Sequence, residues 1–302
     1  MQEPEQQHVQ ATDGQLFSTF CWPVNEPKGR VFIAHGMAEH CLSYRPFAHF
    51  LNQHNYEVVA HNHRGHGDRT PLGHFADRDG WQQVIDDLHT VIESYEDDVP
   101  SYLFGHSMGS FIALSYAAQQ GQQGQHLSGL ILSASNYQSS GLFYLGLGVA
   151  KFLNVFTNRT ATSKLLDQLS FGAFNRAFKP NRTAFDWLSR DHHQVDAYIN
   201  DPKCGHLCSV KFWQDLFGGL IKLNKATTLA AIPHTLPVQL LAGDQDPVGK
   251  MGEGVKRLQT ALKENGVLSV EMTLYPNARH EILNEVNAAE VQQDILQWLQ
   301  QH

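Results

Sequence analysis

The sequence predicts an α/β protein whose mostly parallel central sheet is flanked by helices and interrupted by a mainly helical insertion. Short, continuously hydrophobic stretches alternate with stretches of helical periodicity, as expected for strands that are buried on both faces of a sheet. The alternation stops after residue 136 and resumes at residue 236. With 302 residues, 42% of them hydrophobic and 17% charged, the chain can bury a large core.

The first part of the chain carries most of the predicted strands. Residues 15–24 partly alternate between hydrophobic and polar side chains, and we expect them to pair antiparallel with the segment before Asp13-Gly14. Four hydrophobic runs that follow predict parallel strands, at residues 29–34, 56–60, 101–104 and 127–133. Helical periodicity separates them, at residues 44–55, 81–97 and 110–118. Such short strand–helix–strand units form parallel sheets with right-handed crossovers.

The last part of the chain continues the same pattern. Strands are predicted at residues 237–242 and 268–275, and helices at 255–265 and 288–300. We therefore expect residues 1–136 and 236–302 to form one core domain, and residues 137–235 to form an inserted helical lid.

The composition of the insertion differs from that of the rest of the chain. It holds 11 Lys and Arg against 6 Asp and Glu, a balance of +5, which leaves −13 for the remaining residues. It also holds 14 of the 31 aromatic residues. A basic, aromatic-rich insertion favours a lid that holds the apolar part of a substrate. The alternative is a helical subdomain whose aromatic side chains form its own small core.

Charge, cysteine content and hydrophobicity exclude several classes of protein. The net charge of −8 and the pI near 6.1 argue against a nucleic-acid-binding protein. Four scattered cysteines are too few for a disulfide framework and favour a reducing compartment. We see no secretory signal and no hydrophobic run near the roughly 20 residues that span a bilayer. A cytoplasmic location is expected, with peripheral contact to a membrane or micelle left open, and no oligomeric state is indicated.

Residues 105–109, Gly-His-Ser-Met-Gly, lie between a predicted strand and a predicted helix. A Gly-x-Ser-x-Gly sequence in this context indicates a nucleophile elbow, in which the glycines permit a turn tight enough to expose the serine at the helix N-terminus. The positive end of the helix dipole then faces negative charge that develops on a substrate. Ser107 is therefore the candidate nucleophile, with an ordinary Gly/Ser turn as the alternative.

A serine hydroxyl needs a neighbouring base and a group that orients the base. The chain order Ser, then Asp or Glu, then His selects His280, which follows the last predicted strand. Asp244 and Asp246 both follow the strand at 237–242, at the end of the sheet where sites gather. We favour Asp246, which is better placed to leave the sheet before Pro247, and keep Asp244 as the alternative.

Acyl transfer also needs donors for the developing oxyanion, and two backbone amides usually provide them. One should be the N–H of Met108, directly after the nucleophile. The other should be the N–H of Met37, in the loop after the first buried parallel strand. This chemistry requires no cofactor and no metal, and we expect neither.

Five motifs together resemble the monoacylglycerol lipase and lysophospholipase branch of the α/β-hydrolase fold. They are His35-Gly36-x-x-Glu39-His40, Arg64-Gly65-His66-Gly67, Gly105-His106-Ser107-Met108-Gly109, Gly243-x-x-Asp246-Pro247-Val248 and Arg279-His280-Glu281-x-x-Asn284-Glu285. The resemblance runs from residue 29 to the C-terminus, and residues 183–191 are similar to the lids of bacterial members. It implies a triad of Ser107, Asp246 and His280 with oxyanion donors at Met37 and Met108. The chain departs from many relatives at Asn62, where Asp is common, and at residues 68–70, where a serine is frequent.

The substrate class expected is a monoacyl lipid ester, a monoacylglycerol or a lysophospholipid, because the lid is rich in aromatic side chains. A short-chain carboxylesterase and an aminopeptidase-like amide hydrolase would use the same residues, and a catalytically silent binding protein could share the fold. A haloalkane dehalogenase would need Asp in place of Ser107.

A metal hydrolase is the rival from another mechanistic class. His61-x-His63-x-x-His66 could bind zinc, but Gly65 offers no carboxylate and Arg64 would repel a cation. Cys204-x-His206-x-Cys208 is likewise incomplete as a ligand set and is interpreted as lid packing.

Overall fold

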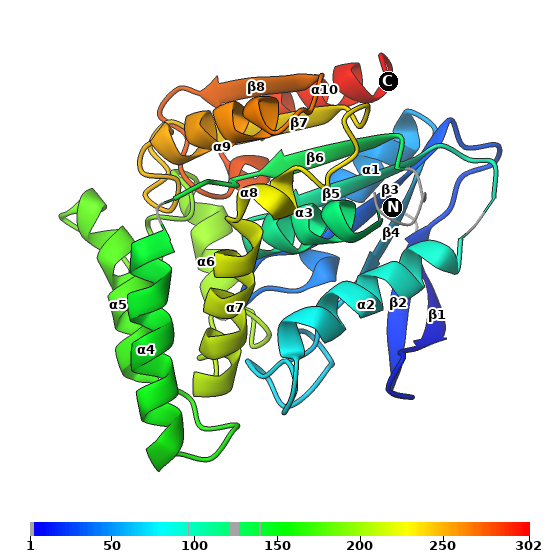
Figure 1. Cartoon of the computed structure of the whole chain (residues 1–302). Coiled ribbons are helices and arrows are strands. Elements are labelled where there is room, and N and C mark those ends of the chain that lie inside the picture. The colour runs from blue at the N-terminus through cyan, green and yellow to red at the C-terminus, as the bar shows by residue number, and fades with distance from the viewer. Residues whose placement is uncertain (1–2, 96, 121–126, 139) are drawn as a thin grey trace.

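A single sheet organises the molecule. The computed structural model describes residues 3–95, 97–120, 127–138 and 140–302. Within these residues the sheet has eight strands in the order β1-β2-β4-β3-β5-β6-β7-β8 (Figure 1). Strand β2 is antiparallel to both of its neighbours, and every other pair is parallel. The predicted mostly parallel sheet is therefore confirmed.

The strands lie close to their predicted positions. They are β1 (Glu5–Gln10), β2 (Leu16–Trp22), β3 (Gly29–Ala34), β4 (Tyr56–His61), β5 (Ser101–His106), β6 (Gly129–Ser133), β7 (Val238–Gly243) and β8 (Val270–Tyr275). All residues of β3, β4, β6 and β7 are buried. This burial explains why their sequences are mostly hydrophobic and do not alternate between hydrophobic and polar residues.

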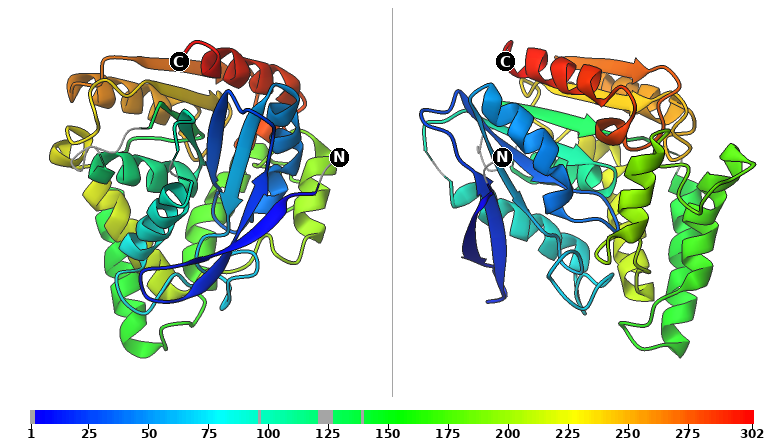
Figure 2. Two further views of the ribbon diagram at one scale, coloured as in Figure 1. Left: turned by 90° about the vertical axis from the view of Figure 1, so that its right-hand side faces the viewer. Right: turned by 180° about the vertical axis from the view of Figure 1, so that it is seen from behind.

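Helices cover both faces of the sheet. Helices α2 (Gly80–Glu93), α3 (Met108–Gln120) and α9 (Glu253–Glu264) share one hydrophobic cluster with it. Helices α1 (Arg45–Gln53) and α10 (Ala288–Leu299) share a second cluster on the opposite face, as the right-hand view of Figure 2 shows. The two-layer helical cover buries the hydrophobic side chains of the central strands from both sides.

One helix is shorter than its sequence indicated. The helix predicted at 81–97 spans Gly80–Glu93, and residue 96 lies outside the described residues. The guanidinium of Arg30 binds the carbonyl oxygen of Tyr95 and the carboxylate of Asp97. These bonds attach Tyr95 and Asp97 to Arg30 of β3.

In the part of the chain that is described, the residues between β6 and β7 form five α-helices and one short 3-10 helix (Arg176–Phe178). The α-helices are α4 (Ser140–Phe156), α5 (Lys164–Asn175), α6 (His192–Asn200), α7 (Val210–Leu223) and α8 (Ala226–Leu229). They differ in their distance from the sheet. Helix α7 packs against α2 and α3 and buries Phe212 and Trp213 in the main core, whereas α4 and α5 lie farther out (Figure 1). The division into core and lid stays a prediction, because α7 contributes to the main core.

None of the described helices is both long enough and hydrophobic enough to cross a bilayer.

Candidate active site

Ser107 lies in the turn between β5 and α3. Its φ angle is 51°, in the left-handed region, so the turn is strained as expected for an elbow. A Cβ atom at Gly109 would lie 2.0 Å from the carbonyl oxygen of Ala34 in β3, so only glycine allows this close approach. The backbone N–H of Ser107 donates to Ser133 in β6 at 2.9 Å. These contacts place the Ser107 side chain at the carboxyl end of the sheet, where it is partly exposed.

The predicted base and acid lie next to it. The Nε2 atom of His280 is 2.9 Å from the Oγ of Ser107, and the Nδ1 atom is 3.0 Å from an Oδ of Asp246. Asp246 is fully buried, and its other oxygen accepts the backbone N–H of Val248 at 2.9 Å. The structure therefore aligns a hydroxyl, an imidazole and a carboxylate, the arrangement that permits nucleophilic catalysis by serine.

The alternative acid, Asp244, faces a different partner. One of its oxygens accepts the N–H of Asn277 at 2.7 Å, in the loop that leads from β8 to His280. A Cβ at Gly243 would lie 2.1 Å from the carbonyl oxygen of Ala278, so this loop passes directly over the end of β7. Asp244 thus holds the loop that carries His280, and Asp246 faces the imidazole.

Two rings pack against His280 that sequence reasoning did not assign to the site. The centroids of Trp187 and His106 each lie 5.0 Å from the centroid of His280. Trp187 belongs to the insertion, and its carbonyl oxygen accepts the N–H of His280 at 3.4 Å. His106 was visible only as a variable position of the Gly-x-Ser-x-Gly motif. Both rings restrict the orientation of the imidazole.

A buried charged cluster lies behind His106. The cluster consists of His106, Glu281 and Glu39. The Nε2 atom of His106 is 3.3 Å from an oxygen of Glu281, and Glu39 accepts the phenolic O–H of Tyr44 at 2.8 Å. Burial by itself lowers the pKa of His106, but the carboxylates of Glu281 and Glu39 outweigh burial and raise it to about 9. Burial and the charge of Glu281 raise the pKa of Glu39 to about 7. His106 is therefore cationic at neutral pH and cannot act as the general base.

The predicted oxyanion donors come from two separate segments of the chain. Met108 is the first residue of α3, and Met37 follows His35-Gly36 at the end of β3. Both residues line the same cavity as Ser107. The neighbouring Ala38 has a left-handed φ of 57°, and its carbonyl oxygen accepts the N–H of Gly205 at 2.8 Å and the O–H of Tyr198 at 2.9 Å. The insertion therefore holds the loop that carries the Met37 amide.

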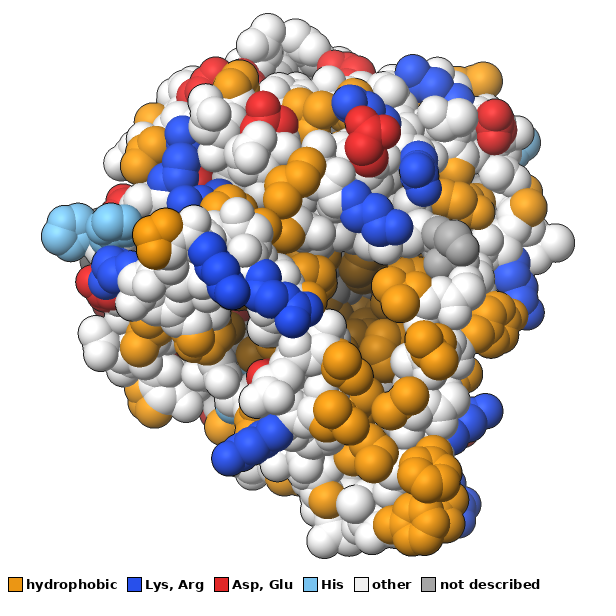
Figure 3. Space-filling model, turned by 90° about the vertical axis from the view of Figure 1, so that its left-hand side faces the viewer, with side chains coloured by type: hydrophobic (Ala, Val, Ile, Leu, Met, Phe, Trp, Pro, Cys, Tyr) orange, Lys and Arg blue, Asp and Glu red, His pale blue; other side chains and the backbone are white. Residues whose placement is uncertain are grey.

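A cavity of about 670 Å³ extends from Ser107 into the insertion. Its lining is mostly hydrophobic and comes largely from α4, α5 and α7, including Val149, Leu166, Phe171 and Phe217. Figure 3 shows the hollow from the side of α4 and α5, with Lys and Arg side chains along part of its rim. The site can thus bury a long apolar group while it presents a polar bond to Ser107.

The segment from Asp186 to Arg190 anchors the insertion to the core. The carboxylate of Glu285 accepts the side chain of Arg190 at 2.8 Å and the backbone N–H groups of Arg190 and Arg279. The Arg279 side chain donates to the carbonyl oxygens of Asp186 and Ser189. Because these bonds surround His280, this part of the insertion positions the site as well as covering it.

The departures at Asn62 and residues 68–70 have local partners. The amide of Asn62 accepts the N–H of Cys41 at 2.9 Å and donates to Asp68 at 2.8 Å. Arg69 pairs with the buried Asp87 at 2.7 Å. These side chains hold the loop after β4 and lie outside the lining of the main cavity.

The histidines of the rival metal site pack against one another and against His35. Ring centroids are 4.2 Å apart for His35 and His63, and 5.2 Å apart both for His61 and His63 and for His35 and His66. Among the described residues, two groups of three His, Cys, Asp or Glu side chains have ligand atoms within 4.8 Å of one another, and neither group contains His61, His63 or His66. His61, His63 and His66 therefore form part of the buried structure next to the loop that follows β3 and carries Met37.

These buried histidines predict acid lability. Burial lowers the pKa of His61 to about 4 and lowers those of His35, His63 and His66 well below the ordinary value of 6.5. Below pH 6.5 these four histidines are therefore protonated in the unfolded chain but neutral in the folded chain, which favours unfolding. Glu39 has the opposite effect, because it binds one proton more readily in the folded chain. We expect the free energy of unfolding, measured by urea titration, to fall as the pH drops from 7 to 5.

The control for this prediction is His61→Gln, which removes one of the four histidines. Its free energy of unfolding should depend less on pH over the same range, by about one proton. Salt-bridged carboxylates such as Asp13, whose pKa is lowered to about 2 mainly by its hydrogen bond to Arg64, titrate below this range. Equal pH dependence in the two proteins would contradict the assignment.

Comparison with known proteins gives consistent matches. The family described as Hydrolase_4: Serine aminopeptidase, S33 matches residues 25–287. The chain is 28% identical to a monoglyceride lipase of Mus musculus over 93% of its own length and 88% of that protein. It is also 28% identical to a monoacylglycerol lipase of Mycolicibacterium smegmatis, over 93% and 91% of the two chains. A thermostable carboxyl esterase from Bacillus coagulans, solved with glycerol, superimposes with a TM-score of 0.89 at 28% identity and 99% coverage of both chains.

Proposed function

Because the chain belongs to the Hydrolase_4 (serine aminopeptidase, S33) family of α/β hydrolases, we propose that it hydrolyses the carboxylic ester bond of monoacylglycerols. The observation that carries this proposal is the continuity of the Ser107 hydroxyl with a long hydrophobic cavity. The relatives named as monoglyceride and monoacylglycerol lipases support the same substrate class. A lysophospholipid shares the acyl group and is the related candidate.

In the proposed mechanism, His280 removes the proton of Ser107 as the Oγ attacks the ester carbonyl carbon. Asp246 orients the imidazole and stabilises its protonated form. The amides of Met37 and Met108 donate to the oxyanion of the tetrahedral intermediate. The protonated His280 then gives its proton to the leaving alcohol, and a water molecule activated by the same imidazole hydrolyses the acyl-enzyme.

We assign the insertion, residues 137–235, the role of a lid over the core formed by residues 1–136 and 236–302. The apolar lining from α4, α5 and α7 would hold the acyl chain, with the ester at Ser107. Other hydrophobic side chains of α4 and α5 lie outside the cavity lining, where Phe152, Val155, Phe156 and Leu165 are all more than half exposed. Together with exposed lysines such as Lys151 and Lys164, this face suits peripheral contact with a membrane or micelle. The cytoplasmic location expected from the cysteines stays a prediction.

A short-chain carboxylesterase is the second candidate, since the similar structure from Bacillus coagulans is described as a carboxyl esterase. The two functions differ in how the rate depends on acyl length. Each methylene buried in the cavity contributes up to about 0.8 kcal/mol, or about fourfold in kcat/KM. With glycerol monoesters from acetyl to palmitoyl, we expect kcat/KM to rise with chain length until the cavity is filled. A series that peaks at acetyl would exclude the lipase proposal, and matched lysophospholipids would test the head group.

Two glycines of α4 offer a matched pair for this experiment. A Cβ at Gly146 would lie 2.7 Å from the ring of Phe217, and both residues line the cavity, whereas a Cβ at Gly148 would meet nothing within 4 Å. Gly146→Val should therefore shift the optimum toward shorter acyl chains. Gly148→Val should leave the profile unchanged. Identical profiles for the two variants would place the acyl chain elsewhere.

A further inference from the structure

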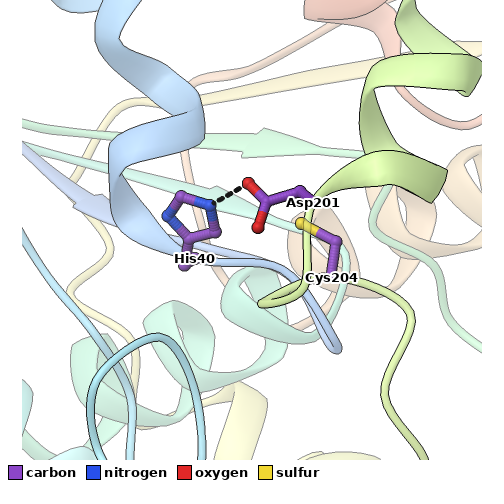
Figure 4. Close-up of side chains that lie close together, drawn as sticks. All are labelled: His40, Asp201 and Cys204. Carbon is purple, nitrogen blue, oxygen red and sulfur yellow. Dashed lines mark hydrogen bonds and ion pairs between the residues drawn. The ribbon is translucent and has the colours of Figure 1, made fainter.

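A second group of side chains with metal-binding chemistry lies outside the proposed catalytic residues. His40 comes from the loop after β3, and Asp201 and Cys204 follow α6 in the insertion (Figure 4). The Nε2 of His40 lies 2.9 Å from an oxygen of Asp201. One nitrogen, one carboxylate oxygen and the sulfur all lie within 4.8 Å of one another. The cluster therefore joins residues that are more than 160 positions apart in the sequence.

The three residues line a cavity of their own. Its volume is about 230 Å³, and its lining includes the carboxylates of Glu39 and Glu281 in addition to His40, Asp201 and Cys204. The carboxylate of Asp201 favours a cation in this cavity, whereas the charges of Glu39 and Glu281 are offset by the neighbouring imidazole of His106. The cavity also leaves space for a water molecule beside the three side chains, which a three-residue metal site needs to complete its coordination.

The donor set selects the class of cation. Imidazole, carboxylate and thiolate together suit zinc, which forms tetrahedral sites with bonds of about 2.0–2.3 Å to these atoms. The donor atoms of such a site lie about 3.5 Å from one another, so small side-chain movements suffice here. Magnesium and calcium prefer oxygen ligands alone and fit the cluster poorly.

We propose that His40, Asp201 and Cys204 bind a zinc ion, with water from the cavity as the fourth ligand. This site is separate from the proposed hydrolysis, which proceeds through Ser107 without it. Burial first, and then the negative charges of Glu39 and Asp201, raise the pKa of the Cys204 thiol above its ordinary value. Zinc binding therefore breaks the S–H bond, forms the S–Zn bond and releases the proton to solvent.

Zinc at this position would join the insertion, through Asp201 and Cys204, to the loop after β3 that carries Met37 and His40. Gly205, next to Cys204, already donates its N–H to the carbonyl oxygen of Ala38, two residues before His40. The hydroxyl of Tyr198 and the contact between His40 and Asp201 join the same two segments. A bound ion adds bonds that exist only in the folded chain, so it stabilises the folded protein.

The test is zinc titration of the full chain after treatment with a chelator and its removal. We expect one equivalent of zinc per chain, measured by calorimetry, and a higher temperature of thermal unfolding in its presence. Magnesium at the same concentration should produce no shift. Cys204→Ser and Asp201→Asn should each weaken the affinity for zinc at least tenfold.

Cys208→Ala is the matched control, because Cys208 lies in the same segment but is buried away from the cluster in the main hydrophobic core. It should bind zinc as the unmodified protein does. Hydrolysis of a p-nitrophenyl ester by each variant reports whether it is folded. If Cys204→Ser and Asp201→Asn both bind zinc with unchanged stoichiometry and affinity, zinc binds elsewhere and the proposal is wrong. If the unmodified protein does not bind zinc at 100 micromolar, the proposal is also wrong. This concentration corresponds to a binding free energy of about 5.5 kcal/mol.

Discussion

Ser107→Ala should reduce kcat for monoacylglycerol hydrolysis by about 10⁴-fold to 10⁶-fold, because it removes the atom that attacks the ester. The remaining side chains of the site should stay in place, since among the described residues the hydrogen bond found for the Ser107 hydroxyl is the one with His280. The KM and the unfolding temperature should therefore change little. Initial rates on glycerol monooleate, with a thermal melt of the same preparation, give both quantities.

A covalent probe provides the control for this experiment. A serine-directed fluorophosphonate should label the unmodified protein once and leave Ser107→Ala unlabelled. A chelator should not reduce the rate at which the unmodified protein hydrolyses the ester. A Ser107→Ala protein that keeps near-normal turnover would exclude the acyl-enzyme mechanism. Loss of turnover on chelation in the unmodified protein would favour metal chemistry instead.

Asp246→Asn should lower kcat by about 10⁴-fold with a small effect on KM. The substituted amide has nearly the same shape as the carboxylate but can donate to the Nδ1 of His280, which favours the wrong tautomer. It also removes the negative charge that stabilises the imidazolium during the reaction. Because Asp246 is fully buried and lies 3.0 Å from that nitrogen, no water molecule can enter to solvate the imidazolium in place of the carboxylate. Steady-state kinetics on one monoacylglycerol measure the effect.

Asp244→Asn is the matched control for Asp246→Asn, two residues away at the end of the same strand. An asparagine at position 244 can still accept the N–H of Asn277, so the loop before His280 should keep its position. We expect less than a tenfold loss of kcat. Equal losses in the two variants would show that the carboxylates hold the loop rather than orient the imidazole.

Local sequence pattern was sufficient for the architecture around Ser107. The strands β3, β4 and β7 could be predicted because burial on both faces favours hydrophobic residues throughout a strand, and the buried charges of Arg30 and Glu57 are paired with each other. The elbow could be predicted because only glycine permits the approach of residue 109 to β3. The order of Ser107, Asp246 and His280 followed from the topology, since loops at the carboxyl ends of parallel strands meet at one edge of the sheet.

The choice between Asp244 and Asp246 marks the limit of this reasoning. Sequence favoured Asp246 by its distance from the strand, but both carboxylates leave the same strand end. The loop after β8 decides the geometry, because it passes so close to Gly243 that Asp244 meets a backbone amide while Asp246 meets the imidazole. Such a crossing depends on how the loop after β8 packs over the end of the neighbouring strand β7, and no local pattern encodes it.

What the sequence by itself determined, then, is the sheet, the strained turn at Ser107 and the segments that supply its partners, since each depends on the conformational preferences of neighbouring residues. Only the tertiary structure decided that Trp187 and His106 enclose His280, that α7 enters the main core, and that His40 meets Asp201 and Cys204. These contacts join residues far apart in the chain. Their energy comes from packing and burial, which exist only once the insertion and the core have folded against each other.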